Sequence, residues 1–212
     1  MTKTKRPITA GALALAGLVL TATIAGASPD SALNAGDLAV RSTDAAVIAV
    51  IAQATRESRT FERMVEIIHA RSGIVYVQPG RCGHGVRSCL VDVMKAGSRR
   101  ILWVKVDVRR PERELMASIG HELGHALEVL DDPTVTNGFA MFHFYRRIST
   151  TGGGSAFETR AAVAAGDTVR AEIRKYRRRE HLAGLRLCEH GTGDVRLATR
   201  NCRPNQSLIP NP

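Results

Sequence analysis

The sequence predicts an α+β domain in which a small mixed or antiparallel sheet packs on helices. Short runs of β-branched and apolar residues gather in the middle of the chain, and segments with helical spacing of apolar residues lie before and after them. The size agrees with this class, because 212 residues with 44% hydrophobic residues suffice for one modest core. The chain shows no coiled-coil pattern and no repeat of roughly 20 to 50 residues. One globular domain is therefore expected.

The N-terminal segment has the pattern of an export signal. Three basic side chains among the first six residues precede an apolar stretch at residues 10–24, which ends in small residues. Cleavage after Ala27 would lower the net charge from +10 to +7, because residues 1–27 carry three basic and no acidic side chains. An uncleaved anchor is the alternative, since residues 8–27 are just long enough to span a membrane. We interpret residues 1–27 as a signal peptide, which predicts a secreted or periplasmic protein without a membrane span after cleavage.

Helices are predicted where apolar residues recur three and four positions apart between a capping residue and a breaker. Thr60 is the predicted N-cap of the second helix, and Gly73 ends that segment. The third helix begins at Pro111 and has Glu112 and Glu114 in its first turn, where acidic side chains face unpaired amide groups. The helices are expected at residues 44–54, 60–70, 111–130, 139–148 and 156–178.

Strands are predicted where short runs are rich in β-branched and aromatic residues. In the third run Leu102, Val104 and Val106 share one face, whereas Trp103 and Lys105 share the other, which is the alternation of a half-buried strand. The strands are expected at residues 74–77, 88–94 and 101–108. They lie directly before the third helix, so the sheet and this helix should pack together.

Four cysteines form an even set in a chain that is predicted to be exported, where disulfides persist. Three pairings exist, and proximity in the sequence favours Cys82–Cys89 and Cys188–Cys202. An alternative makes Cys82, His84 and Cys89 metal ligands, but this spacing matches no common zinc knuckle.

The domain organisation follows from the signal and the second cysteine pair. A hairpin is predicted at residues 185–198, with Gly and Asp in its middle, and the Cys188–Cys202 disulfide would close it. The chain therefore divides into a signal peptide at residues 1–27, a main domain at residues 28–182, and a disulfide-closed hairpin and tail at residues 183–212.

The third predicted helix contains His121-Glu122-Leu123-Gly124-His125, which is the HExxH pattern. Histidines four positions apart lie about 40° apart around a helix, so both imidazoles can bind one ion at about 2.0 to 2.1 Å. Glu122 lies beside them, where its carboxylate can hold a water molecule. The apolar stripe of this helix faces nearly the opposite way, so the histidines are predicted not to face the main core. We therefore predict one catalytic zinc ion with His121 and His125 as ligands.

A catalytic zinc needs a third protein ligand and an open position for water. Asp131 stands six residues after His125, as in the metzincin pattern HExxHxxGxxH, but that pattern has glycine where this chain has Glu128. Glu128 lies about 10 Å along the helix from His121, so we interpret it as a partner of a ligand rather than a ligand. Glu158, near the start of the last long helix, is the third carboxylate. From the residues alone, Asp131 and Glu158 both remain candidates for the third ligand.

The HExxH helix, followed by Phe157-Glu158-Thr159 on a later helix, resembles the gluzincins, a group of zinc metallopeptidases. The likeness covers residues 101–165 and implies a zincin-like catalytic domain. It also implies that His121, His125 and Glu158 bind the zinc and that Glu122 is the general base. The stretches at residues 118–130 and 157–159 also resemble small uncharacterised exported bacterial proteins, a likeness that implies no substrate.

These features predict an exported zinc metallopeptidase that hydrolyses a peptide or protein substrate. Zinc would lower the pKa of a bound water toward about 7, and Glu122 would accept its proton during attack on the carbonyl. His143, Tyr145 and Arg160 are candidate donors to the developing oxyanion. The strand at residues 101–108 could bind an extended peptide at its edge, as the resemblance to zinc peptidases implies.

Two other functions are considered. A zinc amidase acting on the cell wall would share the whole site and differ only in substrate. A non-catalytic, basic envelope-binding protein would keep a structural or vestigial metal site and bind an anionic envelope polymer through clusters such as residues 174–179. Nucleic-acid recognition has little support, because one Trp, three Tyr and five Phe do not interleave with the basic residues.

Overall fold

The computed structural model describes residues 38–83, 85–150 and 157–189. The predicted signal peptide, His84 and Cys202 lie outside these ranges. Four strands and five helices are formed within them, which confirms the α+β class. In chain order these are β1 (Val40–Arg41), α1 (Ala45–Glu57), α2 (Arg59–Ala70), β2 (Gly73–Pro79), β3 (Ser88–Ala96), β4 (Arg99–Val106), α3 (Glu112–Asp131), α4 (Gly138–Ile148) and α5 (Arg160–Glu189).

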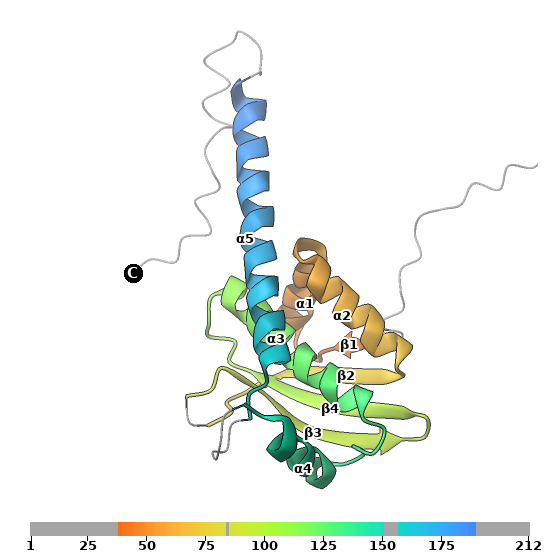
Figure 1. Cartoon of the computed structure of the whole chain (residues 1–212). Helices are drawn as coiled ribbons and strands as arrows, with labels where there is room; N and C mark the ends of the chain where they lie inside the picture. Colours follow the sequence, from red (N-terminus) through yellow and green to blue (C-terminus); the bar gives the residue numbers. More distant parts are fainter. Residues whose placement is uncertain (1–37, 84, 151–156, 190–212) are drawn as a thin grey trace, which may run out of the picture. The chain divides into compact units, whose positions relative to one another are not determined.

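The sheet is mixed and has the order β1-β2-β4-β3 (Figure 1). β1 runs parallel to β2 and β2 runs parallel to β4, whereas β3 and β4 form an antiparallel hairpin. The short strand β1 was not predicted, because two residues carry no periodicity. β4 is internal and β3 forms an edge, so the prediction that the strand at residues 101–108 offers an edge to a peptide was wrong.

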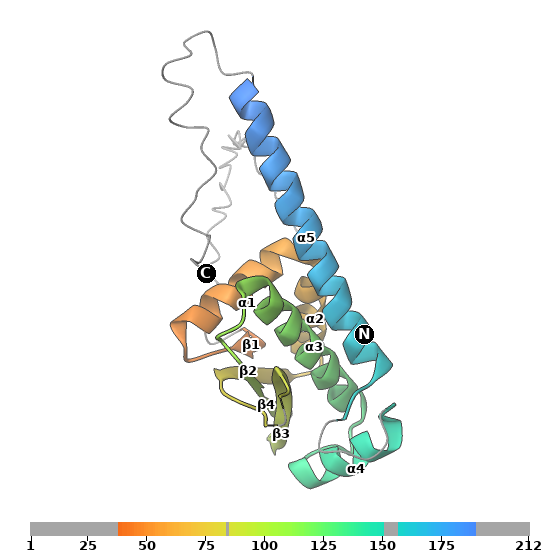
Figure 2. The same ribbon diagram turned by 90° about the vertical axis from the view of Figure 1, so that its left-hand side faces the viewer.

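The core lies between one face of the sheet and the helices. The alternation predicted for β4 is confirmed, because Leu102, Val104 and Val106 are buried and Lys105 is exposed on the other face. Helices α1, α2 and α3 lie over one face of the sheet, and α4 lies beside β3 (Figures 1 and 2). None of the described helices is long and apolar enough to cross a membrane.

The beginning of α2 differs from the prediction in its cap. The Ser58 hydroxyl, rather than that of Thr60, accepts the hydrogen bond from the Phe61 amide, at 3.1 Å. The Thr60 hydroxyl instead donates to Glu172 of α5 at 2.9 Å. The predicted cap residue, Thr60, is thus engaged by a tertiary contact, and the actual N-cap lies two positions earlier in the chain.

Helix α5 begins later and ends later than the predicted helix at residues 156–178. Thr159 caps it by accepting the Ala162 amide at 3.2 Å, so Glu158 lies just before the helix rather than on it. The helix is continuous to Glu189, across the predicted domain boundary between residues 182 and 183. Residues 185–189 are therefore helical and not part of a hairpin, because Leu, Arg and Glu favour a helix. The rest of the predicted hairpin and the Cys188–Cys202 pairing lie outside the described residues.

Candidate metal centre

Helix α3 carries both histidines of the HExxH pattern into a covered position. The side of α3 that turns away from the main core is covered by the start of α5 and by α4, so His125 is buried and His121 is partly exposed. The Tyr145 ring of α4 packs edge-on against the His125 ring, with 5.2 Å between ring centroids. His125 therefore contacts Tyr145, a member of the hydrophobic core, contrary to the prediction, whereas His121 remains partly exposed.

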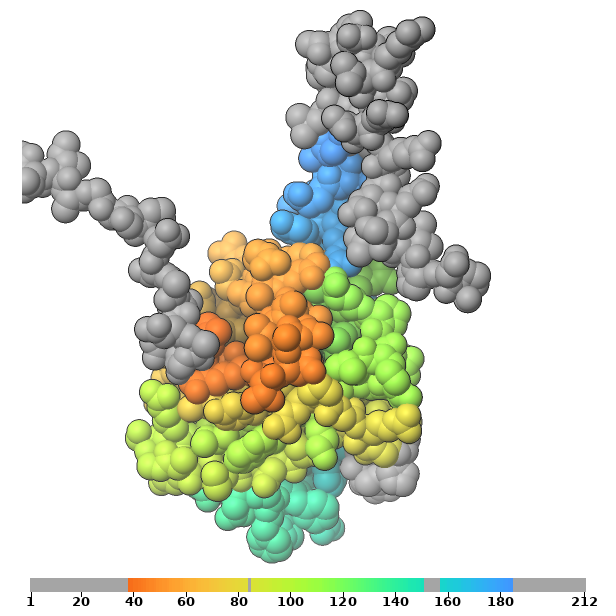
Figure 3. Space-filling model, turned by 180° about the vertical axis from the view of Figure 1, so that it is seen from behind, coloured from red at the N-terminus to blue at the C-terminus, as the bar shows by residue number. Residues whose placement is uncertain are grey.

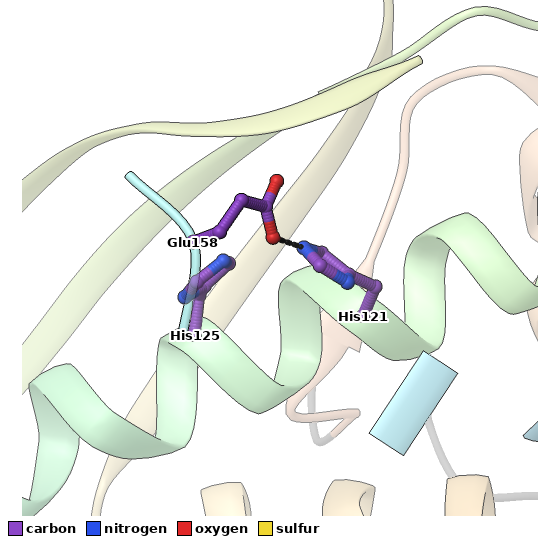
Figure 4. A group of neighbouring side chains, drawn as sticks. All are labelled: His121, His125 and Glu158. Atoms are coloured by element: carbon purple, nitrogen blue, oxygen red, sulfur yellow. Dashed lines mark ion pairs between the residues drawn. The ribbon is translucent and has the colours of Figure 1, made fainter. Parts of the chain in front are cut away.

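His121, His125 and Glu158 form one group that could hold a metal ion (Figure 4). One ligand atom from each residue lies within 4.8 Å of the other two. The Glu158 Oε2 atom is 3.2 Å from the His121 Nε2 atom. Two imidazoles and one carboxylate, with space for a water molecule, are the donor set of catalytic zinc sites, so the residues present fit this ion.

The rival third ligand lies elsewhere. Asp131 is the last residue of α3 and is exposed, and its carboxylate pairs with the guanidinium of Arg71, the C-cap residue of α2. The structure therefore brings Glu158, and not Asp131, to the two histidines.

Glu128 links the two ligand-bearing segments, as its interpretation as a partner of a ligand predicted. Its Oε2 atom lies 3.0 Å from His125 Nδ1, and its Oε1 atom accepts a hydrogen bond from the Thr159 hydroxyl at 2.5 Å. Because Nδ1 of His125 is engaged, Nε2 is the atom free to bind an ion. Thr159 was missed in the sequence, where nothing marks a threonine beside a ligand as a second contact.

Glu122 is almost completely buried, with 2% of its surface exposed. The Ser88 hydroxyl of β3 donates a hydrogen bond to its Oε1 atom at 2.7 Å. Burial raises the pKa of Glu122, although His125, His121 and the Ser88 hydroxyl act in the opposite direction. Ser88 was also missed in the sequence, because it lies 34 positions away and only the tertiary fold places it there.

The charges of the group favour a cationic His121 beside an ionised Glu158. Burial disfavours the charged imidazole, but the hydrogen bond to Glu158 and the Glu122 carboxylate outweigh it, so the pKa of His121 is raised. The hydrogen bond from His121 holds the pKa of Glu158 below its ordinary value, against the effect of burial. A site that stabilises positive charge at this point also suits a metal cation.

Two adjoining cavities open onto the group. The larger, of about 410 Å³, has apolar walls from β3, α4 and the segment before α5, including Leu90, Met141, Phe142 and Phe157. The smaller, of about 310 Å³, is more polar and reaches Arg170. Both are lined by Ser88, His121, Glu122 and Glu158. The candidate metal centre therefore lies at the junction of an apolar and a polar recess.

The predicted oxyanion donors are not arranged for that task. Tyr145 lines the larger cavity, but its hydroxyl donates to the backbone carbonyl of His125 at 2.8 Å. His143 is exposed on α4 and packs against Phe139, while Arg160 is exposed at the first position of α5. The Tyr145 hydroxyl thus links α4 to α3 and is not available as a donor to an oxyanion in the cavity.

The predicted Cys82–Cys89 disulfide is confirmed, with 5.9 Å between the two Cα atoms, so neither thiol is a metal ligand. Both cysteines line the larger cavity.

Comparison with known proteins adds no family to this geometry: no family model, no curated protein and no solved structure matches the chain.

Proposed function

We propose that the chain is an exported zinc-dependent metallopeptidase. One observation carries the proposal: His121, His125 and Glu158 converge within 4.8 Å beside the buried carboxylate of Glu122, and all four line a cavity of about 410 Å³. Buried histidines and acids that meet in a cavity lined by apolar side chains are typical of active sites. The Cys82–Cys89 disulfide supports a location outside the cytoplasm.

The ligand atoms would be Nε2 of His121, Nε2 of His125 and the Glu158 carboxylate. Zinc bound there would supply Lewis-acid activation of a water molecule and of the substrate carbonyl. Glu122 would accept the proton of the attacking water at Oε2, since Ser88 engages Oε1, and would then donate it to the leaving amine. Glu128 would hold the His125 ring in the orientation that directs Nε2 to the ion.

The substrate would lie along the edge strand β3. Ser88, Cys89, Leu90 and Val91 of this strand line the larger cavity, so a peptide added at this edge would pass directly over the metal centre. The apolar walls of the cavity suit an apolar side chain of the substrate. A zinc amidase acting on cell-wall amides would use the same residues, so a substrate panel must contain both peptides and cell-wall fragments.

Metal content tests the proposal most directly. We expect one zinc per mature chain by elemental analysis, and its loss in His121→Ala and in Glu158→Ala. Asp131→Ala is the matched control, because it removes an exposed carboxylate at the end of the same helix and should keep the metal. Glu122→Gln should keep the zinc and lose peptide cleavage by a factor of about 1,000 or more. A wild-type protein that binds no zinc, even when zinc is supplied, would contradict the proposal.

A second function is favoured by a basic groove between the α1–α2 corner and α5. This groove of about 670 Å³ is lined by four cations without an ion pair among the described residues: Arg56, Arg59, Lys175 and Arg179. Of its three acids, Glu57 is paired with Arg177, Glu172 accepts hydrogen bonds from α2, and the exposed Glu62 makes no ion pair among the described residues. In Figure 3 the orange α1–α2 region lies beside the blue α5. We propose that this groove binds an anionic envelope polymer, as in the non-catalytic alternative.

Reversal of one groove charge tests this second function. Arg179→Glu should weaken binding of a soluble acidic polysaccharide by about tenfold, and added salt should weaken it further. Arg99→Glu makes the same charge change on an exposed residue outside the groove and should have a smaller effect. Equal losses in both variants would show that binding depends on the net charge of the protein and not on the groove.

A further inference from the structure

Ser88 is the point at which the sheet contacts the predicted general base. It is the first residue of β3, is 7% exposed, and donates its hydroxyl to Glu122 Oε1 at 2.7 Å. Among the described residues, no other side chain donates a hydrogen bond to this carboxylate. Because Oε1 is engaged, rotation of the carboxylate is restrained and the second oxygen is left for the cavity.

The chain around Ser88 is held by the β3–β4 ladder, in which Ser88 pairs with Val106, and by the disulfide. Cys82–Cys89 closes the loop directly before β3 and bonds to the residue next to Ser88. Within this loop Gly83 and Gly85 both have φ of +75°, and a side chain at either position would meet nothing within 4 Å. In Figure 3 the yellow segment near residue 80 lies at the surface beside the green start of α3. In this open loop the disulfide adds a covalent tie to the strand pairing that holds the start of β3.

Besides the ladder and the disulfide, backbone hydrogen bonds tie the loop at two points. The Asp107 amide donates to the Arg87 carbonyl at 2.9 Å, and the Val86 amide donates to the Gly83 carbonyl at 3.0 Å. The Arg87 side chain is 53% exposed and reaches Glu114 only at 3.7 Å. A hydrogen bond to a buried carboxylate is strong only when its donor is held in place, and a shift of about 1 Å weakens both the bond and the alignment of a base.

We propose that Ser88 is a positioning residue for Glu122, and that the Cys82–Cys89 disulfide holds Ser88 in register with it. The role presupposes the proposed peptidase activity, because Glu122 is the group that would act on the substrate. Ser88 itself would touch no reacting atom, and its effect would pass through the orientation of the Glu122 carboxylate.

Kinetics of three variants separate this role from a structural one. We expect Ser88→Ala to lower kcat by about 10- to 100-fold, with KM changed by less than about twofold and one zinc retained. Ser88→Thr keeps the hydroxyl and should recover most of kcat. Thr60→Val is the matched control, since it removes another hydroxyl-to-carboxylate bond, to Glu172, and should leave kcat unchanged. An unchanged kcat in Ser88→Ala, or a loss that only follows zinc content or folded fraction, would overturn the proposal.

The disulfide is tested by a double-mutant cycle. Replacing both Cys82 and Cys89 by alanine should lower kcat to a similar extent as Ser88→Ala. Combining these replacements with Ser88→Ala should add little, because both act through one hydrogen bond. Effects that multiply would show that the disulfide acts by another route.

A spectroscopic measurement tests the positioning role of Ser88 independently of any enzyme activity. In metal-free protein with ¹³C-labelled glutamate, the Glu122 carboxyl signal is assigned by its absence in Glu122→Gln. At one fixed pH this signal should move in Ser88→Ala and in the double cysteine variant, and stay in place in Thr60→Val. A signal unmoved in the first two variants would overturn the positioning role. If the wild type cleaves no peptide but the signal still moves in Ser88→Ala and in the double cysteine variant, only the peptidase proposal is contradicted.

Discussion

Gly124 of α3 lies directly against Ala162 of α5, so that a Cβ atom on Gly124 would come within 2.9 Å of the Ala162 Cα atom. The same contact recurs along the helix pair, because a Cβ on Gly166 would lie 3.0 Å from the Cβ of His121. The two helices approach this closely only because these positions lack side chains. Their approach is what brings Glu158, just before α5, to His121.

Gly124→Ala should therefore weaken zinc binding, although Gly124 is not itself a ligand. The added methyl group meets backbone rather than a movable side chain, so α5 must shift. We expect a loss of about 2 kcal/mol in the free energy of unfolding, measured with urea on metal-free protein, and a zinc affinity about tenfold lower. Gly184→Ala is the control: this exposed position in α5 has nothing within 4 Å, and alanine should stabilise the helix by about 0.5 kcal/mol. Similar behaviour of the two variants would contradict the role of the close approach.

The Thr159 hydroxyl makes two hydrogen bonds, and one substitution removes both of them. Its oxygen accepts the Ala162 amide at the start of α5, and its hydroxyl donates to Glu128, which in turn contacts His125. Thr159→Val loses both, so we expect about 1 kcal/mol less stability in metal-free protein and a zinc affinity about tenfold lower in chelator competition. Thr159→Ser retains both bonds and should remain close to wild type. An unchanged zinc affinity in Thr159→Val would mean that Glu128 orients His125 without help from α5.

Much of the helical framework could be predicted because its signals are local. The apolar spacing in α2 and α3 and the alternation in β4 each lie within one segment, so their positions were predicted to within a few residues. The HExxH pattern likewise fixes two histidines on one helix face by spacing alone. Glu128 could be interpreted correctly because the rise along a helix excludes it as a ligand of the ion that His121 binds.

The parts that escaped prediction depend on contacts between distant segments. Thr60 is a good cap by local rules, but Glu172 of α5 engages it, and Ser58 caps α2 instead. The place of β4 inside the sheet follows from its pairing with both β2 and β3, which no periodicity reveals. Ser88 reaches Glu122 only because β3 lies across α3, so a serine in the sequence gave no sign of this contact.

Arg100 of β4 fixes the C-terminal end of α3. Its guanidinium donates to the Val129 carbonyl at 2.8 Å and to the Leu130 carbonyl at 2.5 Å, and it also reaches two carbonyls beyond the helix. Arg100→Met keeps the aliphatic stem and removes all these bonds, so we expect a loss of about 2 kcal/mol in chemical unfolding. Arg100→Lys should recover only part, because one ammonium group cannot span the same acceptors. Arg99→Met, which changes an exposed neighbour, should stay within about 0.5 kcal/mol of wild type; an equal loss there would contradict a specific cap.

Glu172 gives the stability of the fold a pH dependence outside the metal centre. Burial opposes ionisation of this carboxyl, but hydrogen bonds from Ser58 and Thr60 and the charge of Arg59 outweigh it and lower its pKa. Because the pKa is lower in the folded than in the unfolded protein, the ionised group stabilises the fold above an unfolded pKa of about 4.3. That contribution is lost as the pH falls through the folded pKa.

Glu172→Gln should therefore be less stable than wild type by about 1 kcal/mol near neutral pH, and the difference should vanish at acidic pH, below the folded pKa. Urea unfolding of both metal-free proteins across this range measures the difference at each pH, so that shifts common to both cancel. Glu66→Gln removes an exposed carboxylate from α2 that makes no ion pair among the described residues, and its difference from wild type should be small at every pH. A constant deficit in Glu172→Gln would assign the effect to packing, because only the loss of an ionised, hydrogen-bonded carboxylate makes the deficit disappear with acid.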